Sequence, residues 1–503
     1  MGRLLVIDPR DDVGIALEDV ASGEPLSVDG NPLRGLRAAE VVPFGHKVSI
    51  RPIRTGEPVR RYGEVIGVAT SDIPPGRHVH THNVASRYKA EGEAATRSSV
   101  TFQVPKPHDR KVEPATAVGS GVTFSGYRRR DGTTGIRNLV VVLALQDNST
   151  SVVRRIGATV PEAVAVGSWF GLAQFGPDHI LRQRVWLGLA THPNVAGAVL
   201  VGLEGASAAP LAEAVAAAGR LVEVVDVQRA GGTVAAAEQG AGLAARMVRE
   251  AARQTREPLR AELIVGLECG ASDNTSGITA NPVIGLVADR LVRLGGTVII
   301  SEPTEMLGAE HLLAQRCANE EVARQLSEII ARRYGLAKSL GVDLLGVNPG
   351  PVNIAAGLST IEEKAMGAIQ KAGSSTICEV VDHGASPGHT GLVVMDAPSP
   401  AVENMTALAA GGAHLILFGT GTCNPVGNPF APTVKITGNP RTAQRMRDHI
   451  DLDVSGVIMG TDSLATSAER AFSLTLEVAS GKLTRAEILG DLEIAISRLN
   501  PSV

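Results

Sequence analysis

A polar stretch at residues 266–282 holds the side chains best suited to chemistry. Within it, a thiol, a hydroxyl and a carboxylate lie close together at Cys269, Ser272 and Asp273. A thiolate or a carboxylate can bind a metal ion, and a hydroxyl can donate to an anionic substrate. Buried, inert thiols are also common, so Cys269 is either a ligand or a small core residue. We predict Cys269 and Asp273 as metal ligands, and Ser272 and Asp273 as substrate-binding residues.

A second polar group follows the apolar run 297–301. It contains Glu302, Glu305 and His311, so two carboxylates lie near an imidazole. Such a set can supply a base, an acid and a cation site. Glu305 has an alternative as an ordinary residue of a first helical turn, where the helix dipole favours a carboxylate. We predict catalytic roles for Glu302 and His311.

The elements around these two groups predict that they meet. Residues 261–267 form an apolar run typical of a buried strand, and Asn281 and Pro282 are favourable at the start of a helix over 283–294. The run 297–301 then predicts a second strand. If the two strands are parallel neighbours joined by that helix, both groups lie at the carboxyl edge of one sheet. Ligands bind in crevices at that edge.

Three histidines in five residues, His78, His80 and His82, mark the N-terminal region. On a strand, alternate side chains share a face, so the three imidazoles would converge on a metal ion or an anion. The alternative is a solvent-facing strand without a ligand. We predict His80 as a catalytic residue and His80 and His82 as metal ligands.

Two loops add candidate substrate contacts. The glycine-rich segment 418–427 offers backbone N–H groups to an anion, and from it we predict Thr420 and Gly421, although such turns are common in strand connections. Arg137 and Asn138 follow a turn and precede a strand. Their side chains have two alternative roles: they bind a substrate carboxylate, or they only hold their own loop in place.

Composition excludes several classes of protein. The chain has 503 residues, 44% of them hydrophobic and 20% charged, with a formal net charge of −4. This favours a folded protein and gives no support to nucleic-acid binding. Four widely spaced cysteines form no CxxC pair, so we expect reduced thiols. No run of about 18 apolar residues occurs, so we expect a cytoplasmic protein without a membrane segment.

The pattern of apolar, polar and turn residues along the chain predicts three folded parts. Residues 1–92 carry short strands, with strand candidates at 48–52, 63–67 and 77–82, and predict a small, mostly β domain. A polar linker that contains several prolines follows at 93–118. Strands and helices then alternate, which predicts a first α/β domain at 119–258 and a second one, with the main site, at 259–503. Its expected elements include strands at 139–145, 199–203 and 221–227 and a helix at 235–255.

These motifs together resemble the altronate and galactarate dehydratase family. The resemblance rests on Arg61-Tyr-Gly-Glu-Val-Ile-Gly, His78-Val-His-Thr-His-Asn, the stretch 266–282, Ser301-Glu302 and Glu363-Lys364, and it covers nearly the whole chain. It implies an N-terminal SAF-type β-clip domain followed by two α/β, Rossmann-like domains with mainly parallel sheets. It also implies a hydro-lyase that acts on sugar acids with a divalent cation, usually iron or a similar metal. Sulfolactate sulfo-lyase resembles the same architecture split over two subunits.

The chain departs from the family pattern where the family usually has cysteine, lysine or arginine. Cysteine motifs are replaced around Asp147, Ser168 and Gly202, a lysine is replaced near Ile354, and an arginine is replaced by Thr422. Cys269 alone survives among the family cysteines. Loss of thiolates shifts the preferred metal from iron towards magnesium or manganese. Loss of the two basic groups favours a monoanionic or smaller substrate over a dianionic one.

The resulting hypothesis is a metal-assisted dehydration that converts a sugar acid into a 2-keto-3-deoxy acid. Asp273 and Glu302 would hold a cation (Fe²⁺, Mn²⁺ or Mg²⁺), His311 or Lys364 would act as base, and a histidine of the 78–82 segment would act as acid or ligand. Two alternatives remain: a lyase of the same fold with another leaving group, such as a sulfolactate-type carbon–sulfur lyase, or a non-catalytic relative that binds a sugar acid. We expect a homo-oligomer.

Overall fold

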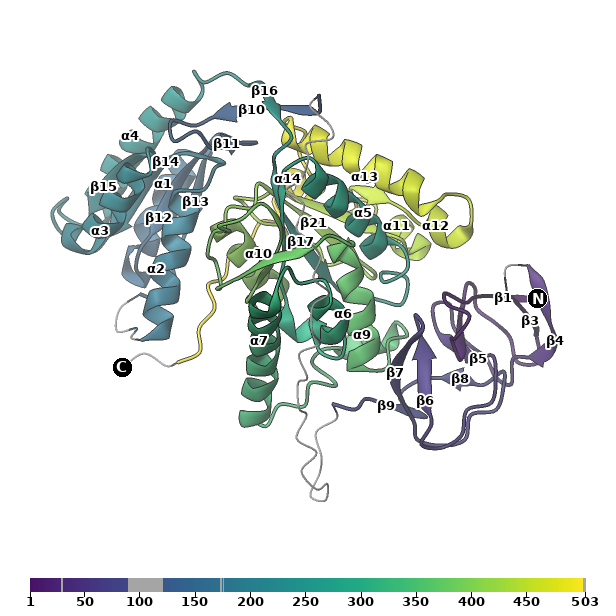
Figure 1. Cartoon of the computed structure of the whole chain (residues 1–503). Coiled ribbons are helices and arrows are strands. Elements are labelled where there is room, and N and C mark those ends of the chain that lie inside the picture. Colours follow the sequence, from purple (N-terminus) through teal and green to yellow (C-terminus); the bar gives the residue numbers. More distant parts are fainter. Residues whose placement is uncertain (29, 89–120, 172–173, 175, 501–503) are drawn as a thin grey trace.

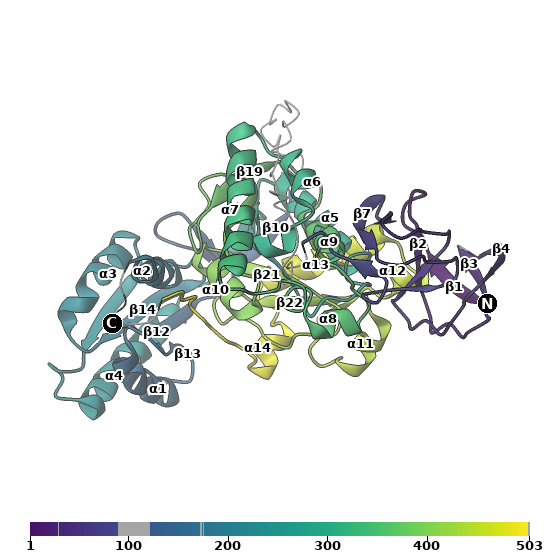
Figure 2. The same cartoon turned by 90° about the horizontal axis from the view of Figure 1, so that it is seen from below.

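The computed structural model describes residues 1–28, 30–88, 121–171, 174 and 176–500. The predicted linker, 93–118, lies outside the described residues. Three parts of the chain are seen in Figures 1 and 2: the N-terminal β domain, a first α/β domain and a second α/β domain that lies between the other two. No helix within these ranges has the length and apolar character needed to cross a membrane.

The N-terminal domain consists of short strands, as the sequence predicts. Six strands form one sheet in the order β4-β3-β1-β2-β5-β8, and three form a second in the order β6-β7-β9. Most pairs are antiparallel, and Val and Ile side chains fill two small cores between the sheets and their loops. The strands are β1 (Gly2–Leu5), β2 (Val13–Ala16), β3 (Pro25–Val28), β4 (Asn31–Arg37), β5 (Lys47–Ser49), β6 (Pro58–Arg61), β7 (Glu64–Ala69), β8 (His78–Val79) and β9 (Val84–Ala85).

One strand prediction in this domain is wrong. The strand expected at 77–82 ends at Val79, and a turn continues through His80 and His82. Asn83 explains the early end, because its side-chain oxygen accepts from the backbone N–H of His80 at 2.9 Å and its amide donates to the carbonyl of His78 at 2.9 Å. These local bonds replace the sheet ladder, which is a common property of asparagine in turns.

The first α/β domain has a four-stranded parallel sheet in the order β13-β12-β14-β15. Its strands are near-continuous Val, Leu and Ala runs because helices cover both faces of such sheets. The predicted strands and helix of this region are all present. The elements are η1 (Asp147–Ser149), β12 (Leu139–Ala144), β13 (Ala163–Val166), β14 (Val195–Gly202), β15 (Leu221–Asp226), α1 (Thr150–Thr159), α2 (Pro177–Ala190), α3 (Gly205–Ala217) and α4 (Thr233–Ala251).

The second α/β domain is built on a seven-stranded parallel sheet in the order β19-β20-β18-β17-β21-β22-β23. The chain enters at the central strand β17, crosses over to β18 on one side, and later returns to β21 on the other side. The carboxyl end of β17 is therefore the point where the strand order reverses, which is where such sheets bind ligands. The strands are β17 (Ile264–Gly270), β18 (Thr297–Ile300), β19 (Ile377–Val381), β20 (Gly391–Met395), β21 (Leu415–Thr420), β22 (Thr433–Thr437) and β23 (Leu452–Asp453).

Helices pack on both faces of this sheet around two apolar cores. The second core continues across to α2 and β14, so it also joins the two α/β domains. The helices are α5 (Ala280–Arg293), η2 (Pro303–Met306), α6 (Glu310–Ala314), α7 (Glu320–Ser339), α8 (Pro351–Ala355), α9 (Ile361–Ala368), η3 (Ile369–Ala372), α10 (Ala401–Ala410), α11 (Pro440–Arg445), α12 (Gly456–Met459), α13 (Leu464–Ala479) and α14 (Arg485–Leu489).

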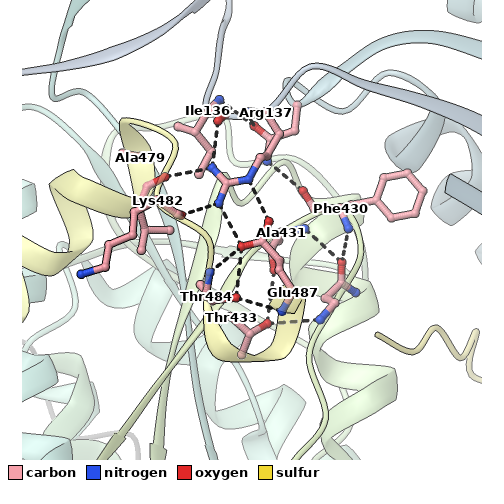
Figure 3. A network of polar contacts seen from close by, with 12 residues as sticks. Ile136, Arg137, Phe430, Ala431, Thr433, Ala479, Lys482, Thr484 and Glu487 are labelled. Atoms are coloured by element: carbon pink, nitrogen blue, oxygen red, sulfur yellow. Dashed lines mark hydrogen bonds and ion pairs between the residues drawn. The ribbon is translucent and has the colours of Figure 1, made fainter. Parts of the chain in front are cut away.

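Strand pairing, an ion pair and the C-terminal segment also tie the α/β domains together. Strand β10 (Thr123–Arg128) pairs antiparallel with β16 (Glu257–Arg260) and with β11 (Thr134–Gly135). Arg137 binds both carboxylate oxygens of Glu487, at 2.8 and 2.9 Å, in a network that Figure 3 shows. The C-terminal segment returns to the first α/β domain, where the backbone N–H groups of Leu499 and Asn500 donate to Asp178.

Candidate active site

A cavity of about 600 Å³ lies at the carboxyl edge of the seven-stranded sheet. The loops after β17, β18, β20 and β21 surround it, together with α7 and the segment that follows α7. Its polar lining includes Cys269, Glu305, Asn348 and Lys364. The cavity therefore sits where the strand order of the sheet predicts a ligand site.

Two neighbouring strands position the thiol and the two carboxylates of the site. Cys269 is the last but one residue of β17, and β18 leads directly to Glu302, which caps η2. Glu302 has a left-handed backbone conformation, with φ of 70°, which non-glycine residues adopt rarely and at a cost. This bend turns the chain into η2, so that Glu302 and Glu305 both face Cys269.

Lys364 and Glu305 form the outer pair of the site, next to the cavity, although both side chains are largely buried. The ammonium of Lys364 donates to Glu305 at 2.6 Å and also to the side-chain oxygen of Asn348. The thiol of Cys269 donates to the other oxygen of Glu305 at 3.2 Å. All four of these residues line the cavity.

A second ammonium lies deeper, behind this pair. Lys371, only 1% exposed, donates to Glu302 at 2.5 Å and to the sulfur of Cys269 at 3.0 Å. The neighbouring Glu268 is fully buried and accepts from the amide of Asn404. Neither Lys371 nor Glu302 is among the residues that line the cavity.

Burial and charge set the protonation of these groups. Burial and the nearby Glu302 raise the pKa of Glu268 well above its usual value, which favours its protonated form. Burial, reinforced by Glu305, raises the pKa of Glu302 to about 8 in spite of Lys371. Burial also acts to raise the pKa of Glu305, but Lys364 and Lys371 outweigh it and hold that pKa below its ordinary value. Glu305 is therefore a carboxylate at neutral pH.

The cluster contains candidate metal ligands, but a lysine already contacts them. Cys269, Glu302 and Glu305 offer ligand atoms that lie within 4.8 Å of one another, which is the donor set of a candidate metal site. However, the ammonium of Lys371 already contacts two of the three donors. A divalent cation bonded to the same atoms would stand against that ammonium in a buried, low-dielectric place. The donors as arranged here do not fit a divalent metal.

Helix α9 joins this site to the N-terminal domain. Thr360 caps the helix, and all eight of its residues are buried, including three consecutive charged ones. Glu362 binds Ser86 and Arg87, while Lys364 faces the cavity. Between them, Glu363 binds Lys47 at 2.8 Å and Arg61 at 2.6 Å, and all three of these side chains are at most 1% exposed.

A second, smaller cavity of about 360 Å³ lies between the N-terminal domain and the second α/β domain. His46, Asp273, Thr422 and Arg445 are among the residues that line it. Asp273 is held there by its own turn, where Thr275 and Ser276 donate to one carboxylate oxygen, and by Asn439, which donates to the other at 2.7 Å. The structure therefore places Asp273 in a different cavity from Cys269 and Glu305.

The histidines gather at the face of the N-terminal domain that meets α8. His80 accepts from the N–H of Thr81 at its Nδ1, and its Nε2 lies 3.0 Å from the carbonyl of Ile354. Both of its nitrogens are thus engaged. His82 is exposed, and its ring lies 5.4 Å from that of His78. The imidazoles are neighbours, as expected, but the turn rather than a shared strand face gathers them, and they are not among the residues that line the larger cavity.

The other predicted residues also lie outside the larger cavity's lining. His311 is 41% exposed and contacts Glu64 at 3.6 Å. Asn138 donates to the carbonyl of Ala251 at 2.7 Å, at the end of α4. Arg137, described above, joins the two α/β domains.

The loop candidates have packing roles. Thr420 donates to the carbonyl of Gly270 at 2.8 Å, and the N–H of Gly421 donates to Ala271 at 3.2 Å. Ser272 is buried, and its hydroxyl has no partner among the described residues. Of the predicted site residues, the structure therefore brings together Cys269, Glu302 and Lys364.

Sequence reasoning missed Lys371 and Asn348. Lys371 had a usable signal, since it lies two helical turns after Lys364 in a stretch that is otherwise mostly apolar. A lysine in such a stretch is buried only when it has partners. Asn348 gave no comparable signal, because its position depends on how the long segment between α7 and α9 folds back over β17.

Comparison with known proteins agrees with this architecture. Residues 2–87 match the family described as altronate/galactarate dehydratase SAF domain, residues 126–252 match D-galactarate dehydratase/altronate hydrolase, second domain, and residues 260–502 match D-galactarate/altronate dehydratase, C-terminal. The chain is 34% identical to altronate dehydratase of Escherichia coli over 511 residues, which cover 98% of both chains. It is 31% identical to altronate dehydratase of Bacillus subtilis over 99% of both.

A third relative is named for a reaction with a different leaving group. The chain is 37% identical over 387 residues to the beta subunit of (2R)-sulfolactate sulfo-lyase of Chromohalobacter salexigens, which covers 76% of this chain and 99% of that subunit. All three relatives are lyases. With the SAF domain, the second domain and the C-terminal domain matched in order, the chain is a lyase that belongs to the altronate/galactarate dehydratase family.

Proposed function

We propose that this chain removes water from a small, monoanionic sugar acid or related 2-hydroxy acid and releases a 2-keto-3-deoxy acid. The observation that carries the proposal is the Lys364–Glu305 pair, which brings an ammonium and a carboxylate together at the surface of a cavity. Dehydration of such an acid needs a cation next to the substrate carboxylate and a base next to the adjacent C–H.

Lys364 is the group that would bind the substrate carboxylate. Its ammonium would also stabilise the enediolate that forms when the neighbouring carbon loses its proton. Asn348, which already accepts from Lys364, holds that side chain in the cavity.

Glu305 is the group that would move the proton. Its carboxylate is ionised because Lys364 and Lys371 hold its pKa down. When a substrate carboxylate takes over Lys364, Glu305 loses one of these partners and becomes a stronger base. The proton removed from C2 then resides on Glu305, which passes it to the departing 3-hydroxyl as the C–O bond breaks, so that water leaves. The resulting enol becomes the 2-keto-3-deoxy acid when its oxygen loses a proton and C3 gains one from solvent.

The lining of the cavity supports a small substrate with one charge. Arg333 also lines it, but its guanidinium is paired with Asp396 at 2.9 Å. The opposite wall is apolar, formed by Leu336, Leu340 and Val342 among others. A substrate with carboxylates at both ends would leave its second charge against this apolar wall, which is costly.

Metal assistance is the other source of positive charge for this reaction. The donor set of Cys269, Glu302 and Glu305 favours it, whereas the position of Lys371 opposes it. Activity after chelator treatment, measured with and without added Fe²⁺, Mn²⁺ or Mg²⁺, separates the two sources.

Turnover of a substrate panel tests the proposed function. Purified protein is given altronate, other aldonates, galactarate and sulfolactate, and 2-keto acid and sulfite are measured separately. We expect keto acid from a monocarboxylate and little product from galactarate. Binding of aldonates without any turnover would contradict the proposal and favour a non-catalytic sugar-acid binder.

A carbon–sulfur lyase is the second candidate. The 37% identity to a sulfolactate sulfo-lyase subunit favours it, and elimination of sulfite needs the same cation and base. Release of sulfite from sulfolactate, with no keto acid from sugar acids, would establish this alternative.

We also propose that the chain forms a homo-oligomer. Its relative is named as one subunit of an assembly, and 87 residues of this chain are 33% identical to the alpha subunit from the same organism. The mass in solution, measured by light scattering after size-exclusion chromatography, tests this; a mass of one chain would contradict it.

A further inference from the structure

We propose that Lys371 is the resident cation of the buried cluster: its ammonium holds Cys269 and Glu302 in the place that a divalent metal would take, so the native site binds no divalent metal and gains one when Lys371 is replaced by a neutral residue. The inference concerns the cation that holds the cluster together. It does not depend on which reaction the protein catalyses.

The contacts of Lys371 place its nitrogen among the metal donors. It lies 3.0 Å from the sulfur of Cys269 and 2.5 Å from Glu302, and the side chain is 1% exposed. Lys371 comes from η3, on the side of the cluster away from the cavity, so its chain fills the approach to the donors from behind.

The hydrogen bonds of Cys269 agree with a lysine partner. Its thiol donates to Glu305 at 3.2 Å and its sulfur accepts from Lys371. A sulfur that donates a proton is a thiol, whereas metals bind the thiolate. In this arrangement Cys269 bridges the two ion pairs as a neutral group.

The charges of the cluster leave nothing for a divalent ion to neutralise. Glu302 and Glu305 face two ammonium groups, Lys371 and Lys364. Whether or not Glu302 carries a proton, the ammonium groups of these two ion pairs at least balance the carboxylates of Glu302 and Glu305, and the neighbouring Glu268 is held by the amide of Asn404. A divalent cation would add two positive charges to a buried cluster that is already neutral or positive.

Removing Lys371 would reverse this balance. The variant Lys371→Leu has no ammonium and no new ligand atom, and it leaves Cys269, Glu302 and Glu305 with an unfilled space between them. Glu302 would then lack an ammonium, while Glu305 keeps Lys364, and a buried charge is kept only when it is paired or coordinates a metal. The donors would then form a site of one thiolate and two carboxylates, which suits a borderline divalent ion.

A cobalt titration tests the inference with the full-length, chelator-treated protein and a non-thiol reductant. Co²⁺ binding is followed by equilibrium dialysis and by the thiolate-to-cobalt charge-transfer absorption, which reports sulfur ligation directly. We expect no such absorption for the wild type, and one equivalent of bound Co²⁺ with the absorption for Lys371→Leu. Adding Cys269→Ala to that variant should abolish the absorption.

Matched variants decide how the result is interpreted. Lys338→Leu, the same change in the last turn of α7, should behave as the wild type does, and Lys371→Arg should keep a positive charge and bind no Co²⁺. One equivalent of thiolate-bound Co²⁺ in the wild type would overturn the inference, as would a folded Lys371→Leu that binds none. If Lys371→Leu does not fold, the wild-type and Lys371→Arg titrations still decide. Because the readout is metal binding, failure of the proposed reaction does not affect it.

Discussion

At the scale of single residues, the site depends on which charged groups reach the cavity. Lys364 and Glu305 line it, whereas Lys371 and Glu302 lie behind them and hold Cys269 in position. The site therefore has two lysine–glutamate pairs. The outer pair is the one that we propose contacts the substrate, and the inner pair supports the structure of the site. The division comes from burial, because only the outer pair can exchange a protein partner for a substrate.

Glu305→Gln is predicted to remove most of the activity without unfolding the protein. Glutamine keeps the shape and can still contact Lys364, but it cannot take a proton. We expect kcat to fall by roughly 10²- to 10⁴-fold, the usual contribution of general base catalysis, with KM changed much less. Steady-state kinetics and circular dichroism check this. Glu320→Gln, at the exposed start of α7, is the matched control; equal activity of both variants would argue against Glu305 as the base.

At the scale of elements, loop packing and helix α9 determine whether the site is assembled. The loop after β21 touches the loop after β17 so closely that a side chain at Gly421 has no room: an added Cβ would lie 2.4 Å from the Cγ and 2.5 Å from the backbone nitrogen of Asp273. Gly421 therefore serves close approach between two loops at the sheet edge.

Gly421→Ala is predicted to destabilise the protein by roughly 1–3 kcal/mol, the usual cost of overpacking. The free energy of unfolding from urea titrations measures it. The matched control is Gly335→Ala in α7, where nothing lies within 4 Å of the added Cβ, and there we expect a gain of roughly 0.5–1 kcal/mol from helix propensity. An equal response at both positions would contradict the packing argument.

Acid is predicted to weaken the contacts of the N-terminal domain with α8 and α9 in two steps. Burial, with help from Lys47, lowers the pKa of His80 to about 4, so the folded state favours neutral His80. The stability from this group is present above its ordinary value of 6.5 and is lost as the pH falls towards about 4. Burial opposes ionisation of Glu363, but Lys47 and Arg61 outweigh it and lower its pKa to about 2, so that its contribution is lost between 4.5 and about 2.

Urea unfolding at a series of pH values checks both windows. Glu363→Gln should lower stability at neutral pH, because it leaves Lys47 and Arg61 buried without their carboxylate, and it should remove the lower of the two acid-dependent losses. A pH profile that is the same in this variant and in the wild type would contradict the assignment to Glu363.

At the scale of the whole molecule, the two α/β domains are fastened by a buried network. Arg137 binds both oxygens of Glu487 and also donates to the carbonyls of Val478 and Lys482, at 2.9 and 2.8 Å. Its guanidinium is thus saturated by this network (Figure 3), and Arg137 is not among the residues that line either cavity. The forked geometry of arginine, which lysine lacks, makes these contacts simultaneously.

Arg137→Met is predicted to destabilise the chain by about 3–5 kcal/mol, because the largely buried Glu487 loses its cation and keeps only its hydrogen bonds from Thr484. KM and kcat of the folded fraction should not change, since Arg137 lines neither cavity. Thermal unfolding and kinetics at a temperature well below the transition check both parts. A large rise in KM with unchanged stability would instead support a role in binding the substrate carboxylate.

The amino-acid sequence by itself determined the type and order of the main elements and the edge at which the chemistry lies. Apolar runs such as 297–300 predict buried parallel strands, and because such strands end at one edge, Cys269 and Glu302 were expected to meet, as they do. The family resemblance rests on the same local motifs. This information is local, since it depends on the period of apolar residues and on the turns between them.

The tertiary structure alone decided which side chains share a cavity and which cation lies among the acids. Lys371 reaches Cys269 across 102 residues of sequence, and Asp273 turns into a second cavity because Asn439, 166 residues away, binds it there. His80 leaves its expected strand face because Asn83 replaces the ladder bonds. Such choices depend on close packing and on the pairing of buried charges between distant segments, and periodicity along the chain carries no information about either.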